Sequence, residues 1–181
     1  NYFVLAIALI FVGIVANVEI LKHFIADEFW VGLDVVPILL FGYVSLGIYM
    51  NLSIWYRLSD QTRFGLYISV FGAVITIVLN LVLIPKYSYM GSAWVSMIAY
   101  FVMMVISYVL GQKYYPIPYN LKRIALYFIS STVIAFVSFF VFNRNIFIGN
   151  GLLILFLGAV YFLEKNELKR FFKKGEAEVE S

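Results

Sequence analysis

Few residues of this chain could do chemistry, and most polar residues within its apolar stretches are uncharged. One set lies in a single stretch, where Gly65, Ser69, Gly72, Thr76 and Asn80 follow one another at steps of four, three, four and four residues. On a helix this spacing places all five on one face. Such a face either lets neighbouring helices approach closely through small residues or lines a hydrophilic cavity. Asn80 favours the cavity, because a side-chain amide is costly against lipid.

A second polar line precedes the first and allows the same two interpretations. It runs through Gly42, Ser45, Tyr49 and Ser53, with Asn51 beside it. From the two lines we take as candidates for lining a substrate cavity the residues Asn80, Thr76, Ser69, Asn51, Ser53 and Tyr49.

Two acids, Glu19 and Asp34, bound the segment between the first two apolar stretches. Acids at the membrane surface are commonly the solvated ends of helices. The alternative is a cation or proton site, because carboxylates near a transport path often have that role. We therefore keep Glu19 and Asp34 as candidates for ion coupling.

The sequence indicates no catalytic or metal chemistry. It has no cysteine, and it lacks the HExxH, nucleophile-elbow and phosphate-loop motifs. Every charged residue lies near a predicted membrane surface, whereas an enzyme needs titratable groups that converge. We expect no catalytic site, no metal and no cofactor, and we expect no nucleic-acid partner because the basic residues flank membrane segments.

The elements that position these residues follow from composition. The chain is 64% hydrophobic and 13% charged, whereas soluble domains carry about 25% charged residues. A membrane-spanning helix needs about 20 apolar residues. The uncharged runs of suitable length are Asn1–Val18, Val35–Tyr56, Phe64–Pro85, Tyr87–Gln112, Ile124–Asn143 and Asn145–Leu163. The sequence thus predicts an all-α polytopic membrane bundle with six transmembrane helices.

The predicted helices are Tyr2–Val18, Val35–Tyr56, Phe64–Ile84, Gly91–Leu110, Ile124–Phe142 and Ile146–Leu163. The mixed segment Glu19–Asp34 suits a short helix in the outer interface, and Glu164–Ser181 reads as a solvated tail. The chain then divides into helices one to four (1–111), a terminal helical hairpin (112–163) and a cytoplasmic tail (164–181).

Orientation follows from the basic residues. Ten of the 13 Lys and Arg residues fall on the side that holds the C-terminus and three on the other. Because short cytoplasmic loops are enriched in Lys and Arg, we expect both ends of the chain to be cytoplasmic. The sequence starts at Asn1 directly in an apolar run, and we expect an N-terminal part to precede it.

The second to fourth predicted helices resemble a known family. The segments that carry the resemblance are Val36-Pro37-Ile38-Leu39-Leu40, Tyr49-Met50-Asn51-Leu52-Ser53, Asn80-Leu81-Val82-Leu83-Ile84-Pro85-Lys86 and Gly91-Ser92-Ala93. They are similar to the C-terminal half of bacterial polysaccharide-biosynthesis exporters, the O-antigen-type flippases related to the multidrug and toxin extrusion fold. The family pattern is close to N-x-x-L-I-P-x-x-G-x-x-G-A-A. Here Ser88 replaces the first Gly and Ser92 the first Ala; both are small, so we expect the tight turn to be kept.

The resemblance implies the second lobe of a two-lobed transporter in the bacterial inner (plasma) membrane. Its partners would be the bilayer, an undecaprenyl-pyrophosphate-linked oligosaccharide (a polysaccharide or O-antigen precursor) moved by alternating access, and the missing N-terminal half of the same chain. A drug or ion exporter on the same fold is the first alternative, and a deep carboxylate would favour it. A membrane glycan polymerase or acyltransferase, or a scaffold that transports nothing, fits the sequence less well.

Overall fold

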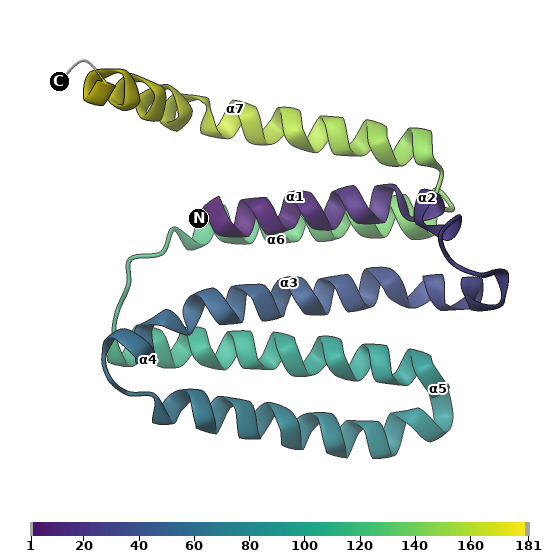
Figure 1. The fold of residues 1–181 in the computed structure, drawn as a ribbon. Helices are drawn as coiled ribbons and strands as arrows, with labels where there is room; N and C mark the ends of the chain where they lie inside the picture. The colour runs from purple at the N-terminus through teal and green to yellow at the C-terminus, as the bar shows by residue number, and fades with distance from the viewer. Residues whose placement is uncertain (1, 180–181) are drawn as a thin grey trace.

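The computed structural model describes residues 2–179, with the side chains of residues 2–165, and every regular element among them is helical. In chain order these elements are α1 (Tyr2–Ala16), α2 (Val18–Lys22), the 3-10 helix η1 (Asp27–Val35), α3 (Val36–Leu52), α4 (Ile54–Leu58), α5 (Arg63–Tyr114), α6 (Leu121–Phe136), the π-helix η2 (Val137–Val141) and α7 (Ile146–Val179). The long helices lie side by side, and Figure 1 shows the start of α1 and the far end of α7 at the same end of the bundle.

Helix α5 crosses the bundle twice. A straight helix of its 52 residues would be about 78 Å long, far more than the roughly 30 Å of a hydrocarbon core. The backbone leaves helical geometry at Ser88 (φ 51°, ψ −134°), and Figure 1 shows two antiparallel limbs that meet in a sharp turn. We call residues 63–87 the first limb and residues 89–114 the second limb.

The all-α membrane bundle is therefore confirmed. Four helical stretches of the described chain are long and apolar enough to cross a membrane: Asp27–Leu58, Arg63–Tyr114, Leu121–Val141 and Ile146–Lys165. Because α5 doubles back, these four stretches make five passes. The shorter apolar α1 runs parallel to them (Figure 1) and makes the sixth.

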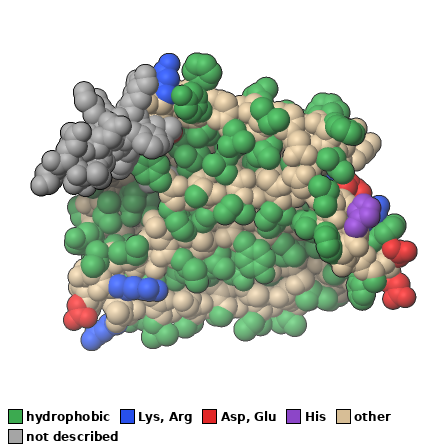
Figure 2. Space-filling model, turned by 45° about the horizontal axis from the view of Figure 1, so that its top comes forward, with side chains coloured by type: hydrophobic (Ala, Val, Ile, Leu, Met, Phe, Trp, Pro, Cys, Tyr) green, Lys and Arg blue, Asp and Glu red, His purple; other side chains and the backbone are tan. Residues whose placement is uncertain are grey.

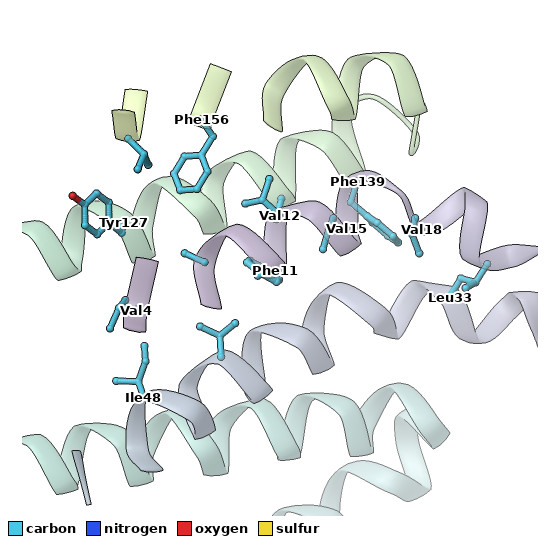
Figure 3. Packing of buried hydrophobic residues seen from close by; sticks show 14 of the residues in the cluster. Val4, Phe11, Val12, Val15, Val18, Leu33, Ile48, Tyr127, Phe139 and Phe156 are labelled. Atoms are coloured by element: carbon cyan, nitrogen blue, oxygen red, sulfur yellow. The ribbon is translucent and has the colours of Figure 1, made fainter. Parts of the chain in front are cut away.

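Helix α1 is the centre of the bundle. It packs against α3, α6 and α7, and Val12 and Val15 on its buried side are each 1% exposed. Figure 3 shows Phe139 and Phe156, which come from the terminal hairpin, in the same cluster as these valines. Lipid is as apolar as these side chains, so the association depends on close packing.

Glycine lets α3 and α5 approach closely. A Cβ atom on Gly42 of α3 would lie 3.1 Å from the Cα of Met97 in the second limb. One on Gly72 would overlap the side chain of Met103, so the two limbs also meet through a glycine. Small residues at helix crossings are a common means of association in membranes.

Several predicted boundaries differ from the structure. The first helix ends at Ala16 and not at Val18, because Asn17 leaves helical geometry (φ −113°, ψ 20°) and its amide donates to the carbonyl of Gly13 at 2.9 Å. The interfacial segment is not one helix but α2 followed by η1. Pro85 does not end its helix, which continues to the turn at Ser88.

Charged side chains lie mainly at the two ends of the bundle. On the face that Figure 2 shows, hydrophobic side chains cover the middle, and Lys, Arg, Asp, Glu and His side chains gather toward the ends. Many large hydrophobic residues are exposed, among them Leu81 at 74% and Phe162 at 70%. A soluble protein rarely presents so large an apolar surface, so this is a membrane protein.

The geometry of Ser88 makes a prediction about stability. Its positive φ with extended ψ is a region that glycine adopts readily and that costs another residue roughly 1–3 kcal/mol. Replacing Ser88 with glycine should therefore stabilise the protein by about 1 kcal/mol, measured as a higher unfolding temperature in detergent. Ser92→Gly, within the helical part of the second limb, should lower that temperature instead. A lower temperature for Ser88→Gly would show that the turn does not depend on φ at this position.

Candidate functional site

Two residues of the polar line on the first limb serve packing. A Cβ atom on Gly65 would lie 2.9 Å from the ring of Tyr56, which is buried. Gly72 packs against the side chain of Met103 in the second limb. At these two positions the line is an interface between helices.

Its other members have different surroundings. Thr76 is half-buried and donates to the carbonyl of Gly72 in its own helix at 2.9 Å. Ser69 is exposed. The side-chain oxygen of Asn80 is buried, and no group within the described part of the chain donates a hydrogen bond to it. Because buried polar atoms nearly always have partners, this oxygen requires an explanation.

Tyr49 joins the two predicted polar lines. It is 7% exposed, its hydroxyl lies 3.5 Å from that of Tyr56, and Ser69 of the first limb lies near it. These hydroxyl groups gather where α3, α4 and the first limb meet. Thr76 and Asn80 lie further along the first limb, toward the turn at Ser88.

The structure does not bring Asn51 and Ser53 to this cluster. Ser53 is 1% exposed and donates to the carbonyl of Met50 at 2.6 Å. Asn51 lines a separate hollow, together with Tyr108 and Tyr119. The six candidates therefore lie in three places: along the first limb with Tyr49, in the buried bend after α3, and in the hollow.

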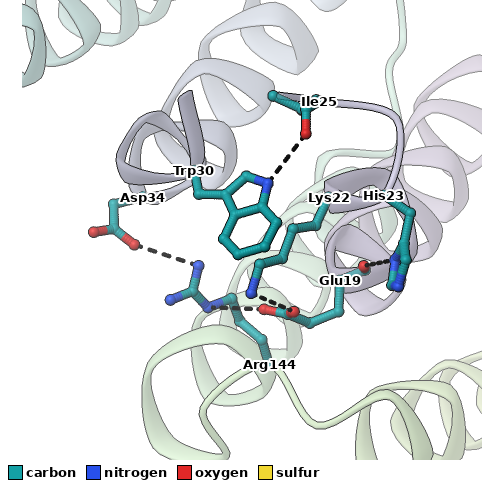
Figure 4. A network of polar contacts seen from close by, with 7 residues as sticks. All are labelled: Glu19, Lys22, His23, Ile25, Trp30, Asp34 and Arg144. Carbon is teal, nitrogen blue, oxygen red and sulfur yellow. Dashed lines mark hydrogen bonds and ion pairs between the residues drawn. The ribbon is translucent and has the colours of Figure 1, made fainter. Parts of the chain in front are cut away.

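The two acids proposed for ion coupling meet at one basic side chain. Arg144, between the π-helix η2 and α7, places its Nε 3.5 Å from Glu19 Oε1 and its Nη1 3.6 Å from Asp34 Oδ1. Lys22 Nζ lies 3.5 Å from the other oxygen of Glu19. Figure 4 shows these ion pairs beside Trp30, whose indole donates to the carbonyl of Ile25.

This cluster, Glu19–Lys22–Asp34–Arg144, ties the loop after η2 to the connection between α1 and α3. The Arg144 guanidinium lies between the two carboxylates that are candidates for ion coupling. Its partners are partly exposed, so each pair contributes little by itself. The sequence places these two connections on one side of the membrane but does not indicate which of their charges pair.

Sequence reasoning missed a buried carboxylate. Glu164, predicted to begin a solvated tail, lies within α7 and is 3% exposed. It accepts a hydrogen bond from the hydroxyl of Tyr127 on α6, and its Oε2 lies 3.5 Å from Arg123 Nη1. The available signal was spacing, because Phe156, Val160 and Glu164 follow at steps of four and all three are buried.

A second polar contact was also missed. The side-chain amides of Asn17, the residue directly after α1, and Asn150 of α7 exchange two hydrogen bonds, of 3.2 and 3.1 Å. At the same crossing a Cβ atom on Gly149 would lie 3.0 Å from the carbonyl oxygen of Ala16. Paired amides and a glycine are usual means of joining membrane helices, so this contact fixes the end of α1 against the terminal hairpin.

The described side chains contain no cluster of three or more His, Asp and Glu residues that could hold a metal ion. What they offer instead is a set of uncharged hydroxyl and amide groups within the spans, with ion pairs at the two ends. Such groups can bind and orient a polar solute by hydrogen bonding.

Comparison with known proteins gives a match to one family model. No curated protein and no solved structure matches the chain. The MatE family model matches residues 2–82, which comprise α1 through most of the first limb, whereas the motif that begins at Asn80 extends beyond the match. Residues 2–82 are thus similar to the MatE family, whose members are membrane exporters and flippases rather than enzymes.

Proposed function

We propose that this chain is part of a flippase that carries a lipid-linked oligosaccharide across the bacterial inner membrane. The observation that supports it is the line of uncharged hydroxyl and amide side chains formed by Tyr49, Ser69, Thr76 and Asn80 along α3 and the first limb. Sugars are neutral and rich in hydroxyl groups, and hydroxyl and amide side chains both donate to and accept from them. A cationic drug would instead require a carboxylate within the path.

A drug exporter is the main alternative, because the MatE match is equally consistent with a flippase and with a drug exporter. Glu164 is the buried carboxylate that could serve it, but Arg123 and Tyr127 already pair with Glu164. The resemblance to polysaccharide exporters adds support for the oligosaccharide, with undecaprenyl pyrophosphate as its lipid carrier.

A pyrophosphate group adds a requirement. An anion that crosses an apolar layer needs cationic partners, and Arg pairs well with phosphate oxygens. In this chain all 13 Lys and Arg residues lie outside the uncharged apolar runs. We therefore propose that the N-terminal half of the same protein supplies Arg or Lys residues within its helices, facing the line of polar side chains on α3 and the first limb.

The Asn80→Leu variant tests whether this line of polar side chains acts in transport. Its amide oxygen is buried without a donor, so replacing it with an apolar side chain should not lower stability. Loss of one hydrogen bond to substrate should reduce export by about fivefold to tenfold. Export is measured as the polysaccharide that reaches the cell surface, normalised to protein level.

Ser130→Ala provides the control, because Ser130 is half-buried on α6 and its hydroxyl donates to carbonyls of its own helix. We expect unchanged export for that variant. Loss of protein in proportion to activity in Asn80→Leu would show instead that Asn80 only packs the bundle.

Deleting the gene in its own host tests the substrate class. A flippase deletion should cause lipid-linked oligosaccharide to accumulate on the cytoplasmic leaflet while susceptibility to cationic drugs stays unchanged. Unchanged oligosaccharide pools together with increased drug susceptibility would favour the drug exporter.

A further inference from the structure

A groove runs along the bundle between the second limb of α5 and α6. These two helices hardly contact one another, whereas α3 packs on α5 and α1 packs on α6. Two hollows, of about 380 Å³ and 280 Å³, lie between them, and α1, α3, α5 and α6 all contribute to each. We call the two hollows together the lateral groove.

The hollows follow one another along the helices. The larger includes Met104 and Val105 of the second limb, and the smaller includes Trp94 and Met97, two turns earlier. Phe128 of α6 lines the larger and Phe41 of α3 lines the smaller. The centroids of these two rings are 5.0 Å apart, so a pair of aromatic side chains narrows the groove between the hollows.

The larger hollow has the size and lining of a binding site. Its 380 Å³ falls within the roughly 300–1,000 Å³ of small-molecule pockets, which are mostly apolar with a few polar groups. Here those groups are Asn51, Tyr108 and Tyr119. Burial and the neighbouring Tyr108 phenol raise the pKa of Tyr119, so its hydroxyl remains a donor at neutral pH.

Basic residues lie in the chain beside those that line this end of the groove. Lys122, which is exposed in the first turn of α6, and Arg123, which pairs with Glu164, lie between Leu121 and Ile124, both of which line the larger hollow. Lys113 lies in the last turn of the second limb, and Gln112 beside it donates to the carbonyl of Ile117 in the loop that leads to α6. An apolar hollow with a basic border suits a chain of hydrocarbon attached to an anion.

We propose that the larger hollow binds one acyl chain of an anionic phospholipid, with the phosphate of the lipid beside Lys122 and Tyr119. Membrane lipids reach the groove from the bilayer, because the groove opens between two membrane-spanning helices. Each basic residue near an anionic surface adds attraction equivalent to about fivefold in affinity. This proposal does not depend on the transported substrate.

Native mass spectrometry of the purified full-length protein tests it, with phosphatidylglycerol and phosphatidylethanolamine offered at equal concentration. We expect retention of phosphatidylglycerol over phosphatidylethanolamine in wild type. Ala125→Phe places a ring into the hollow that Ala125 lines and should abolish retention. The matched control, Ala159→Phe, changes an exposed alanine of α7 and should retain lipid as wild type does.

Lys122→Gln distinguishes binding of the lipid head group from binding of the acyl chain, because the substitution leaves the hollow unchanged. It should reduce the preference for phosphatidylglycerol by about fivefold. Equal lipid retention by Ala125→Phe and Ala159→Phe would overturn the proposal, as would an unaltered preference in Lys122→Gln. Protein purified from its own host gives a further test. If it retains an isoprenoid-linked glycan in place of phospholipid, the proposal is overturned and the hollow is assigned to the transported substrate.

Discussion

Replacing Gly91 with alanine is expected to destabilise the protein by about 2–3 kcal/mol, a cost typical of side chains forced into a packed space. Gly91 lies three residues after the turn at Ser88, where the second limb starts back along the first. A Cβ atom there would lie 2.7 Å from the carbonyl oxygen of Leu83 and 2.9 Å from its carbonyl carbon. Because the obstacle is backbone, it cannot move aside as the end of a side chain can, and the two limbs must separate.

Gly151→Ala is the matched control for this substitution. Gly151 also lies in a helix, but a Cβ atom there would meet nothing within 4 Å. Alanine favours helix by up to about 1 kcal/mol relative to glycine, so this control should be neutral or slightly stabilising. Both are measured as unfolding midpoints of the protein in detergent. Equal midpoints for Gly91→Ala and wild type would show that the limbs do not approach as closely as the structure has them.

Replacing Glu164 with leucine is expected to cost about 2–3 kcal/mol. Removing one partner of a fully buried ion pair costs roughly 3–5 kcal/mol because the other charge is left uncompensated. The cost is lower here, since the Arg123 side chain is 35% exposed and water can reach it. The Tyr127 hydroxyl also loses its acceptor. The expected result is a lower unfolding midpoint, measured in the same detergent.

A second substitution distinguishes the ion pair from simple packing. Arg123→Met combined with Glu164→Leu removes both charges, and replacing both partners by apolar groups is often neutral. The double variant should therefore be more stable than Glu164→Leu alone. Glu28→Gln, at an exposed acid of η1, should change stability by less than about 0.5 kcal/mol. A double variant no more stable than Glu164→Leu alone would mean that Arg123 does not stabilise the buried position of Glu164.

The number of membrane passes could be predicted from the sequence because lipid imposes a simple constraint. Every backbone polar group must be satisfied within the span, so an uncharged run of suitable length is a helix. The position of the turn near Ser88 was also predictable from the motif around Pro85. Small residue size alone does not explain the turn. Size matters at Gly91, where the backbone of Leu83 approaches closely, whereas Ser88 is constrained by its positive φ.

Features that depend on which helices become neighbours could not be predicted. The sequence places Glu19, Asp34 and Arg144 at one membrane surface, but their pairing requires the terminal hairpin to pack beside α1. Glu164 appeared solvated because a charged residue after an apolar run usually ends a span. Its burial depends on Tyr127, which is 37 residues away in the chain. The lateral groove likewise exists because α5 and α6 stand apart, which no pattern within either helix indicates.

Flipping of a lipid-linked oligosaccharide by the full-length protein in liposomes tests the proposed function most directly. The vesicles contain undecaprenyl-pyrophosphate-linked oligosaccharide, and an impermeant glycosidase reports the fraction exposed outside as a function of time. We expect wild-type protein to expose the protected inner pool, Ser130→Ala to do so equally fast, and Asn80→Leu to do so about fivefold to tenfold more slowly. Exposure no faster than in protein-free vesicles, with the same preparation transporting a cationic drug, would contradict the flippase and establish the drug exporter in its place.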